Sequence, residues 1–328
     1  MDFSQALVDA VRAAVGVPAA AYALAAVGLN LQFGYTGLLN FGQVGFLLVG
    51  AYGTAITADH GLPLPLAFLV GVAAAVVLGL ILGLPTLRLR AEYLAIVTIS
   101  AAEILRLVVR SRPLEGFTGG AFGIREFADA FYNWNPIPSG EYGVGNVTFS
   151  DRTLWVMLVG WTLVALTSGL IFLLVRSPWG RVLRGIRDDE NATRSFGKNV
   201  FAFKLQSLVL GGSIGALAGI LLAVDAQFTN ADYWQSIFTF FAFTVIIIGG
   251  VGRVIGPVVG SMLFWFLLQG ADTLLQQALA DSFFGSKLGP TEAGPIRFAL
   301  VGLVLMLLMI FRPQGLFGSR AETLIEEP

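Results

Sequence analysis

Four amide side chains are the most chemically informative residues in this sequence. Asn30, Gln32, Asn40 and Gln43 lie in a glycine-rich, otherwise apolar stretch, NLQFGYTGLLNFGQVGFLLVGAYG, at positions 30–53. An amide inside a bilayer needs partners from protein or water, because lipid provides none. Asn40 and Gln43 are three residues apart and share a helix face. Two interpretations stay open for them: contact with a zwitterion in transit along a translocation path, and fixed interhelical hydrogen bonds.

A second glycine-rich tract, IIIGGVGRVIGPVVG, occupies positions 246–260. It holds Gly249 and Gly250, followed by Arg253 and Pro257. Closely spaced glycines, a charge and a proline disfavour a continuous straight helix, so the tract predicts a break or a re-entrant turn. In transporters, discontinuous helices in corresponding positions mark the transport path near the bilayer midplane. We therefore assign Gly249 and Gly250, with the four amides, to a predicted translocation path.

Other reactive groups are sparse. The chain has no cysteine, which excludes disulfides and thiolate chemistry, and its single histidine, His60, fits a solvated loop. Glu103 and Arg106 are three residues apart in an apolar run, and we interpret them as a structural ion pair rather than a substrate site. No G-x-x-x-x-G-K-[ST] phosphate loop occurs. We expect no catalytic residue, no metal site and no cofactor on this chain.

The composition is that of a membrane protein. Hydrophobic residues make up 56% of the 328 residues and charged residues 12%, whereas soluble domains average about 25% charged residues. A net charge of −1 argues against nucleic acid as a partner. Residues 1–13 carry Asp2, Asp9 and Arg12 rather than a cationic start and a cleavage site, so no removable signal peptide is expected.

Apolar runs near the roughly 20 residues needed to cross a bilayer recur along the whole chain. The candidate spans are 14–33, 36–57, 64–86, 91–109, 153–175, 202–223, 234–251, 255–278 and 296–311. We expect one all-α, polytopic membrane domain covering residues 1–328, with about 8–10 transmembrane helices that include broken or re-entrant segments. Glycines spaced by four, such as Gly211, Gly215 and Gly219, predict close helix packing.

Basic residues set the expected orientation, because cytoplasmic loops collect Lys and Arg. The segment 176–204 is the densest basic stretch of the chain, so we place it in the cytoplasm. Counting spans outward from it puts the acidic segment 110–152 outside, as a water-exposed loop. The same count puts the C-terminal residues Arg312 and Arg320 in the cytoplasm.

The cytoplasmic segment predicts a docking helix. Ser177 can cap a helix that begins at Pro178, and Gly197 is a good stop, which gives one helix of about four or five turns. Its expected apolar contacts are Val182, Leu183, Ile186, Ala192 and Phe196. The alternative is a helix lying on anionic lipid. The three consecutive acids at 188–190 favour a protein partner, because anionic lipid would repel them.

Five segments resemble the permeases of branched-chain amino acid ABC importers of the LivM type. They are GYTGLLNFGQVGFLLVGAY, LRLRAEYLAIVTIS, WGRVLRGIRDDENATRSFGKNVFAFKLQSLVLGGSIGALAGILLA, IIIGGVGRVIGPVVGSML and FRPQGLFG. They occur in the order and spacing of that family, and the resemblance runs from about Gly28 to Gly318, nearly the whole chain.

The resemblance implies a permease subunit of the bacterial inner membrane that carries Leu, Ile and Val inward. It implies a heterodimer with a second, related permease, two cytoplasmic ATPase subunits that hold ATP and Mg, and an extracytoplasmic binding protein. Glu190, Ala192 and Gly197 match the family's coupling loop, with Asn191 replacing its first Ala. The residues expected to couple to the ATPases are Arg181, Arg184, Arg187, Asp189, Glu190, Ala192 and Gly197.

Two alternatives to this function stay open. Related permeases for urea and short amides share the architecture, and the permease sequence alone fixes neither the substrate nor whether other neutral amino acids pass. An ion-coupled secondary transporter would need an unpaired acid within the membrane or a histidine relay, and Glu103 beside Arg106 is a poor candidate for that role.

Overall fold

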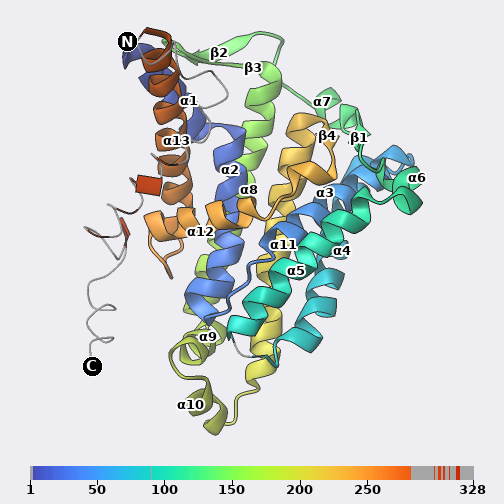
Figure 1. Cartoon of the computed structure of the whole chain (residues 1–328), viewed down its shortest axis with the longest axis vertical. Coiled ribbons are helices and arrows are strands. Elements are labelled where there is room, and N and C mark those ends of the chain that lie inside the picture. Colours follow the sequence, from blue (N-terminus) through green and yellow to red (C-terminus); the bar gives the residue numbers. More distant parts are fainter. Residues whose placement is uncertain are drawn as a thin grey trace.

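The computed structural model describes residues 3–89 and 91–281, together with residues 299, 302–303, 306, 310 and 315–317. Helices form nearly all of its regular structure (Figure 1). The α-helices are α1 (Phe3–Val15), α2 (Val17–Asn30), α3 (Gln43–Asp59), α4 (Leu64–Thr86), α5 (Ala91–Arg110), α6 (Glu115–Thr118), α7 (Asp129–Asn133), α8 (Asp151–Arg176), α9 (Pro178–Asp188), α10 (Glu190–Ser195), α11 (Val200–Ala226), α12 (Ile237–Gly249) and α13 (Gly256–Asp281). The shorter elements are the π-helical turn η1 (Leu31–Tyr35), the 3₁₀ turns η2 (Arg112–Leu114) and η3 (Ala231–Tyr233), and the strands β1 (Ile124–Arg125), β2 (Glu141–Val144), β3 (Val147–Ser150) and β4 (Phe228–Thr229).

The predicted all-α membrane fold is confirmed. Six helical segments are long and apolar enough to cross a bilayer: Val17–Tyr35, Leu64–Thr86, Asp151–Arg176, Val200–Ala226, Ala231–Gly249 and Gly256–Gln277. Helices α3 and α5 match two further predicted spans. The last predicted span, 296–311, lies largely outside the described residues.

One predicted span begins in the wrong place. We expected a helix over 36–57, but α3 begins only at Gln43. The preceding residues form an irregular connection in which Gly37 has φ of 74°, a left-handed conformation that a helix cannot contain. The first broken region therefore consists of η1 and this connection, residues 31–42.

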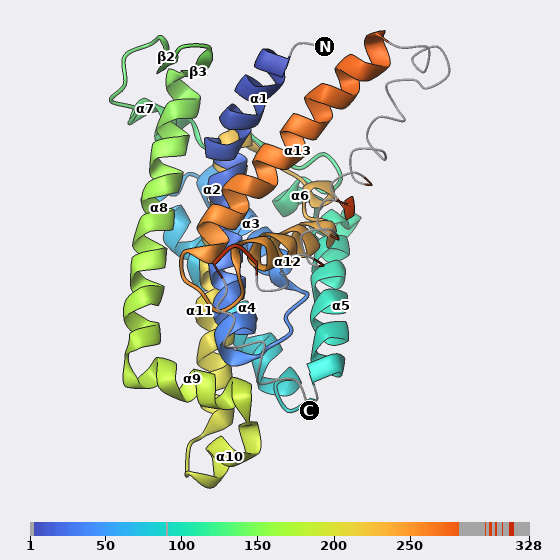
Figure 2. The ribbon, with the colours of Figure 1, turned by 90° about the vertical axis from the view of Figure 1, so that its left-hand side faces the viewer.

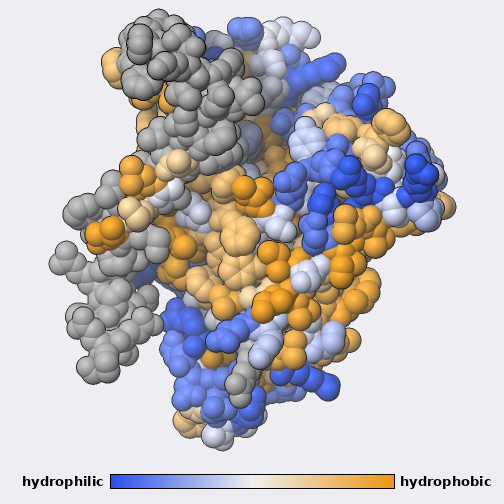
Figure 3. Space-filling view, viewed as in Figure 1, coloured by the Kyte–Doolittle hydropathy of each residue, from blue (hydrophilic) through white to orange (hydrophobic). Residues whose placement is uncertain are grey.

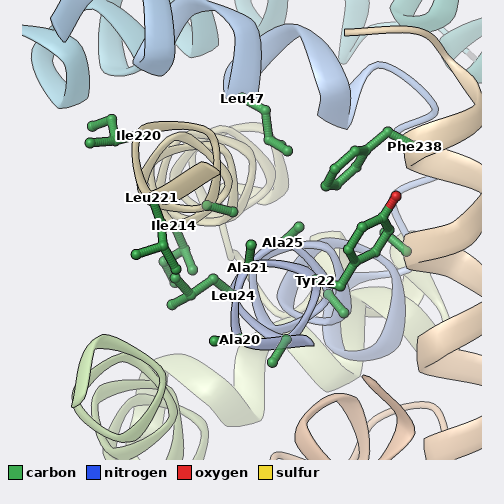
Figure 4. Close-up of a cluster of buried hydrophobic side chains, with 14 of the residues drawn as sticks. Ala20, Ala21, Tyr22, Leu24, Ala25, Leu47, Ile214, Ile220, Leu221 and Phe238 are labelled. Atoms are coloured by element: carbon green, nitrogen blue, oxygen red, sulfur yellow. The ribbon is translucent and has the colours of Figure 1, made fainter. Parts of the chain in front are cut away.

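Helix α2 lies at the centre of the bundle. Thirteen of its residues, all except Pro18, are buried, and it packs against α11, α13, α8 and α12. Figure 4 shows Ala21 and Ala25 of α2 on the side where larger side chains of the surrounding helices lie, such as Ile214, Leu47 and Phe238. Tyr22 stacks on Phe238 of α12 with 4.1 Å between ring centroids. Small side chains on α2 allow several helices to approach one axis.

One close approach of helix backbones in this core joins α2 to α11. A Cβ placed on Gly28 would overlap the carbonyl of Gly211, and a Cβ on Gly211 would overlap the carbonyl of Gly28. The glycines spaced by four on α11 therefore form a face for close helix packing, as the sequence predicted. Gly215 and Gly219 extend it along α3, where added Cβ atoms would overlap Gln43 and the backbone of Leu47.

The outer surface has an apolar band. In Figure 3, hydrophobic residues gather around the middle of the visible face, and hydrophilic residues gather at the α9–α10 end and over the short elements at the opposite end. Large apolar side chains of α4 and α8, including Leu69, Ile81, Leu166 and Leu173, are exposed. Figure 2 shows α5 and α8 running along the molecule while α12 lies across it near mid-height.

The segment 110–152 contains no helix longer than five residues. Strands β2 and β3 form an antiparallel hairpin, and β1 pairs antiparallel with β4. The hydroxyl of Tyr132 in α7 donates to the carbonyl of Val224, 3.0 Å away, at the end of α11. The segment therefore covers the end of the bundle opposite α9, and its extracytoplasmic location stays a prediction.

The glycine contact between α2 and α11 predicts a destabilised Gly28→Ala variant. Its Cβ has no space to occupy, and overpacking costs about 1–3 kcal/mol. We expect a lower melting temperature of the purified protein, measured by fluorescence-detected size-exclusion chromatography after heating. The matched control is Gly169→Ala on α8, where a Cβ meets nothing within 4 Å. Equal melting temperatures of the two variants would contradict this account of the core.

Candidate functional site

The first broken region brings three of the four predicted amides into one hydrogen-bond network. Asn40 Nδ2 donates to Gln32 Oε1 at 2.8 Å and to Gln43 Oε1 at 3.2 Å. Asn40 Oδ1 accepts from the backbone N–H of Gly42 at 2.9 Å, just before α3 begins. All three amide side chains are buried. These hydrogen bonds hold the turn between η1 and α3 in place, and all of their partners belong to this chain.

Two of these amides also attach the broken region to α11. Gln32 Nε2 donates to Leu208 O, and Gln43 Nε2 donates to Gly211 O, both at 3.1 Å. The approach requires glycine on α11, because a Cβ on Gly211 would lie 2.6 Å from Gln32 Nε2. Asn40 lies in the irregular connection before α3, so the predicted helix face shared by Asn40 and Gln43 is wrong. Gln43 makes a fixed interhelical hydrogen bond to α11, and Asn40 bonds to Gln32 and Gln43. Contact with a solute stays a prediction.

Asn30 joins the first broken region to the second. Its Nδ2 donates to Arg253 O at 2.9 Å, and its Oδ1 accepts from the backbone N–H of Gly252 at 3.0 Å. One buried amide therefore satisfies both a donor and an acceptor of the loop between α12 and α13. Gly34 is required for this approach, since a Cβ there would overlap Asn30 and lie 2.6 Å from Gly252 N.

The second broken region lies where the sequence predicted it. Helix α12 ends at Gly249 and α13 begins at Gly256. Gly250 has φ of 108°, a conformation that L side chains rarely adopt. A Cβ on Gly249 would overlap the carbonyl of Gly256, so the glycines let the ends of the two helices approach closely. The backbone N–H of Phe317 donates to Gly249 O at 3.2 Å, which satisfies a terminal carbonyl of α12.

Hydroxyl groups that the sequence reading did not select complete the site. Thr98 Oγ1 accepts from Phe41 N at 3.1 Å, and Thr239 Oγ1 accepts from Val44 N at 3.0 Å. Thr36 Oγ1 donates to a carbonyl of η1 at 2.9 Å. These side chains satisfy backbone groups that an unbroken helix would pair internally. Their signal in the sequence is weak, because threonine is common in apolar spans and the partners of Thr98 and Thr239 are distant in the chain.

The segment with the predicted docking helix forms two helices, α9 and α10, so the single predicted helix of four or five turns is wrong. Asp189 adopts an extended conformation between α9 and α10. Its carboxylate accepts from the backbone N–H groups of Asn191 at 2.8 Å and Ala192 at 3.0 Å, and thus caps α10. Ser177 does not cap α9 as predicted, because its hydroxyl donates back to Leu174 O. Gly197, with φ of 74°, follows α10 as the expected stop.

The apolar residues predicted to make contacts fall into two groups. Leu183 and Ile186 of α9 are buried, and Val182 is partly buried. Ala192 is exposed and Phe196 is 83% exposed, so the apolar contacts of these two residues stay a prediction. The chain changes direction at Asp189, so α10 does not continue the buried apolar face of α9.

The predicted coupling residues differ in their contacts within the chain. Arg181 and Arg184 are exposed, and Glu190 pairs with Arg194 at 2.7 Å and also with Lys204. Arg187 points inward: its Nη1 donates to Gly34 O of η1 at 2.9 Å, and its Nε pairs with Asp188 at 3.0 Å. Arg187 therefore connects α9 directly to the first broken region.

The predicted ion pair on α5 is present. Arg106 Nε donates to Glu103 Oε2 at 3.0 Å, and Arg106 Nη1 also lies 3.3 Å from Asp232 Oδ1. Arg110 reaches the same carboxylate at 3.2 Å. These contacts tie α5 to η3, which supports a structural role. Among the described residues, no cluster of His, Cys, Asp and Glu could hold a metal ion.

Comparisons with known proteins identify related sequences over almost the whole chain. Residues 13–311 match the family described as branched-chain amino acid transport system / permease component. The high-affinity branched-chain amino acid transport system permease protein LivM of Salmonella typhimurium is 31% identical over 312 residues, covering 90% of this chain and 67% of the relative. The protein of the same name from Escherichia coli is 30% identical with the same coverage. The probable branched-chain amino acid transport permease protein LivM of Methanocaldococcus jannaschii is 26% identical, covering 91% of each chain.

The amide network predicts that Asn40→Leu destabilises the protein. The substitution leaves the buried oxygens of Gln32 and Gln43 without this donor, and an unsatisfied buried group costs about 1–3 kcal/mol. We expect a lower melting temperature of the purified protein. Asn146→Ala, at an exposed asparagine, is the control. If the two variants have the same melting temperature, the network does not stabilise the first broken region.

Proposed function

This chain belongs to the family of branched-chain amino acid transport permeases, and we propose that it is the permease subunit of an ATP-driven ABC importer that carries Leu, Ile and Val inward. It is a multi-pass membrane protein, and we place it in the bacterial plasma membrane with the α9–α10 segment and the C-terminus in the cytoplasm. The related proteins named above are permeases of branched-chain amino acid transport systems, which supports this substrate class.

The contact of Arg187 with η1 is the observation that supports ATP-driven coupling most directly. Arg187 Nη1 donates to Gly34 O, and a Cβ on Gly252 would lie 3.3 Å from the same Nη1. Arg187 thus lies against both broken regions. Asn30 joins these regions to each other through two hydrogen bonds. A displacement of α9 would therefore reach both breaks at once.

The exposed surface of α9 and α10 is suited to receive an ATPase. These helices form one tip of the molecule (Figure 2). Phe196 follows the end of α10 and is exposed, and the exposed cations Arg194 and Lys198 lie two residues from it in the chain. A bulky aromatic side chain of this kind is an effective anchor in a partner's groove. We assign coupling to Arg181, Arg184, Arg187, Asp189, Glu190, Ala192 and Gly197, with ATP and Mg held by two partner ATPase subunits.

We place the translocation path beside the two broken regions. The proposed residues are Asn30, Gln32, Asn40, Gln43, Gly249 and Gly250. In the described conformation the four amides bond to partners within the chain. A path with few free polar groups would bind its substrate weakly. We propose that an extracytoplasmic binding protein selects the substrate, and that a second, related permease forms the other half of the path.

Transport of urea or short amides by the same mechanism is the alternative substrate assignment. A secondary transporter of another class is less compatible with the contacts of α5. Glu103, the acid that ion coupling would have to use, is held by Arg106.

Uptake measurements test the proposed function. The chain is reconstituted into proteoliposomes with its co-encoded permease, both ATPases and the binding protein, and uptake of labelled leucine and labelled urea is followed. We expect ATP-dependent leucine uptake that Glu190→Lys abolishes, because the change reverses the charge beside Arg194 and Lys204 at the docking tip. Urea uptake alone would overturn the substrate. ATP-independent leucine flux through this chain by itself would overturn the importer mechanism.

Coupling through Arg187 is tested by Arg187→Gln. We expect leucine uptake to fall by about tenfold or more while ATP hydrolysis continues, because loss of one charged hydrogen bond is worth roughly 1.5–3 kcal/mol. Asp188→Asn is the matched control: it removes the ion pair to Arg187 and keeps the bond to Gly34. Since exposed ion pairs contribute little, its uptake should stay within about twofold of the unmodified protein. Equal uptake by the two variants would show that the contact with η1 is dispensable.

A further inference from the structure

A groove of about 760 Å³ opens between α8, α9, the loop after α12 and the start of α13. Its walls are mostly apolar and include Trp161, Val164, Ala165, Phe172, Ile255 and Val258. Phe172 and Ile255 are exposed, so the groove opens on the outer surface of the chain. The groove shares Arg184 with the proposed coupling residues and touches the broken regions at Tyr35 and Gly252, but its apolar wall on α8 has no part in the proposed function.

The groove is long. On α8 its lining runs from Trp161 to Arg176, a distance of about 22 Å at the rise of 1.5 Å per residue of an α-helix. One leaflet of a bilayer contributes about 15 Å of hydrocarbon. An acyl chain lying along α8 would therefore reach from the level of Arg176 through its leaflet.

Three arginines are among the residues that line the groove. They are Arg176, Arg184 and Arg253, from α8, α9 and the second broken region. Within the part of the chain that the structure describes, none of them pairs with a carboxylate, whereas Arg187 and Arg194 do. Arg176 stacks over Phe172 with its guanidinium 4.0 Å from the ring centroid. Guanidinium groups without acids favour a phosphate, which they bind in a bidentate manner.

We propose that this groove binds an anionic phospholipid of the leaflet on the α9 side. Its phosphate lies against the three arginines and one acyl chain follows α8. Basic pockets between transmembrane helices are suited to anionic headgroups. The lipid would contact α9 and the second broken region together, because Arg184 and Arg253 come from these two elements. This inference does not depend on the proposed transport function.

Fluorescence quenching tests the proposal, and the absence of native cysteine makes labelling specific. A bimane label is attached at Ala165→Cys in the groove, with Leu173→Cys, exposed on α8 and outside the groove lining, as the positional control. The full chain is reconstituted in phosphatidylcholine vesicles that contain a minor fraction of one brominated lipid. That lipid is either phosphatidylglycerol or phosphatidylcholine, and in both cases the bromine is at the middle of the acyl chain. We expect brominated phosphatidylglycerol to quench the Ala165 label at least threefold more than brominated phosphatidylcholine, and the two lipids to quench the Leu173 label equally.

Charge variants complete the test. Arg176→Gln with Arg253→Gln should remove the preference for phosphatidylglycerol at the Ala165 label, whereas Arg88→Gln, at an exposed arginine outside the groove lining, should keep it. Equal quenching by the two lipids in the unmodified arginine background would overturn the proposal. A label at Ala165 that neither lipid quenches, beside a quenched label at Leu173, would also overturn it, because another protein chain would then cover the groove.

Discussion

A helix that breaks inside a membrane exposes backbone groups that lipid cannot satisfy, and this constraint determines the centre of the molecule. Asn30 meets it by bonding to Gly252 N and Arg253 O across the two broken regions. Gln32 and Gln43 meet it by bonding to carbonyls of α11. The glycines are needed because these amides must approach the backbone directly. Polar side chains and glycines in this apolar chain are therefore parts of one arrangement.

The same arrangement gives the molecule a mechanical connection from its surface to its centre. Arg187 extends from α9 to Gly34 in η1, and Asn30 continues the connection to the loop after α12. Helix α12 lies across the bundle and is held at its end by the residues around Phe317 (Figure 2). If α9 is moved by a partner, the elements that respond first are the ones whose helices are already broken. This supports assigning coupling and translocation to connected parts of one site.

The sequence was informative where a residue type has the same structural effect in almost any context. Charge density and apolar length predicted the class of fold, and the glycines with Pro257 predicted the break at 250–255. It was less informative where one side chain can form several different local hydrogen bonds. Asp189 could have been part of one long helix, but its carboxylate caps α10 and so separates α10 from α9. The contact of Arg187 with Gly34 could not be predicted, because it joins residues 153 positions apart and exposed arginines surround it. Likewise, Thr98 and Thr239 resemble ordinary residues of apolar spans until the fold places them against the start of α3.

The central claim is that α9 and the two broken regions move as one body. Spin labels at Asp188→Cys on α9, Ile255→Cys after α12 and Ile104→Cys on α5 allow these movements to be measured by double electron–electron resonance in the reconstituted complex, with and without ATP. The account predicts that ATP changes the distances from the α5 label to both other labels, while the distance between the α9 label and the Ile255 label stays constant. A change in the α9 label's distance from α5, without a matching change for Ile255, would contradict it.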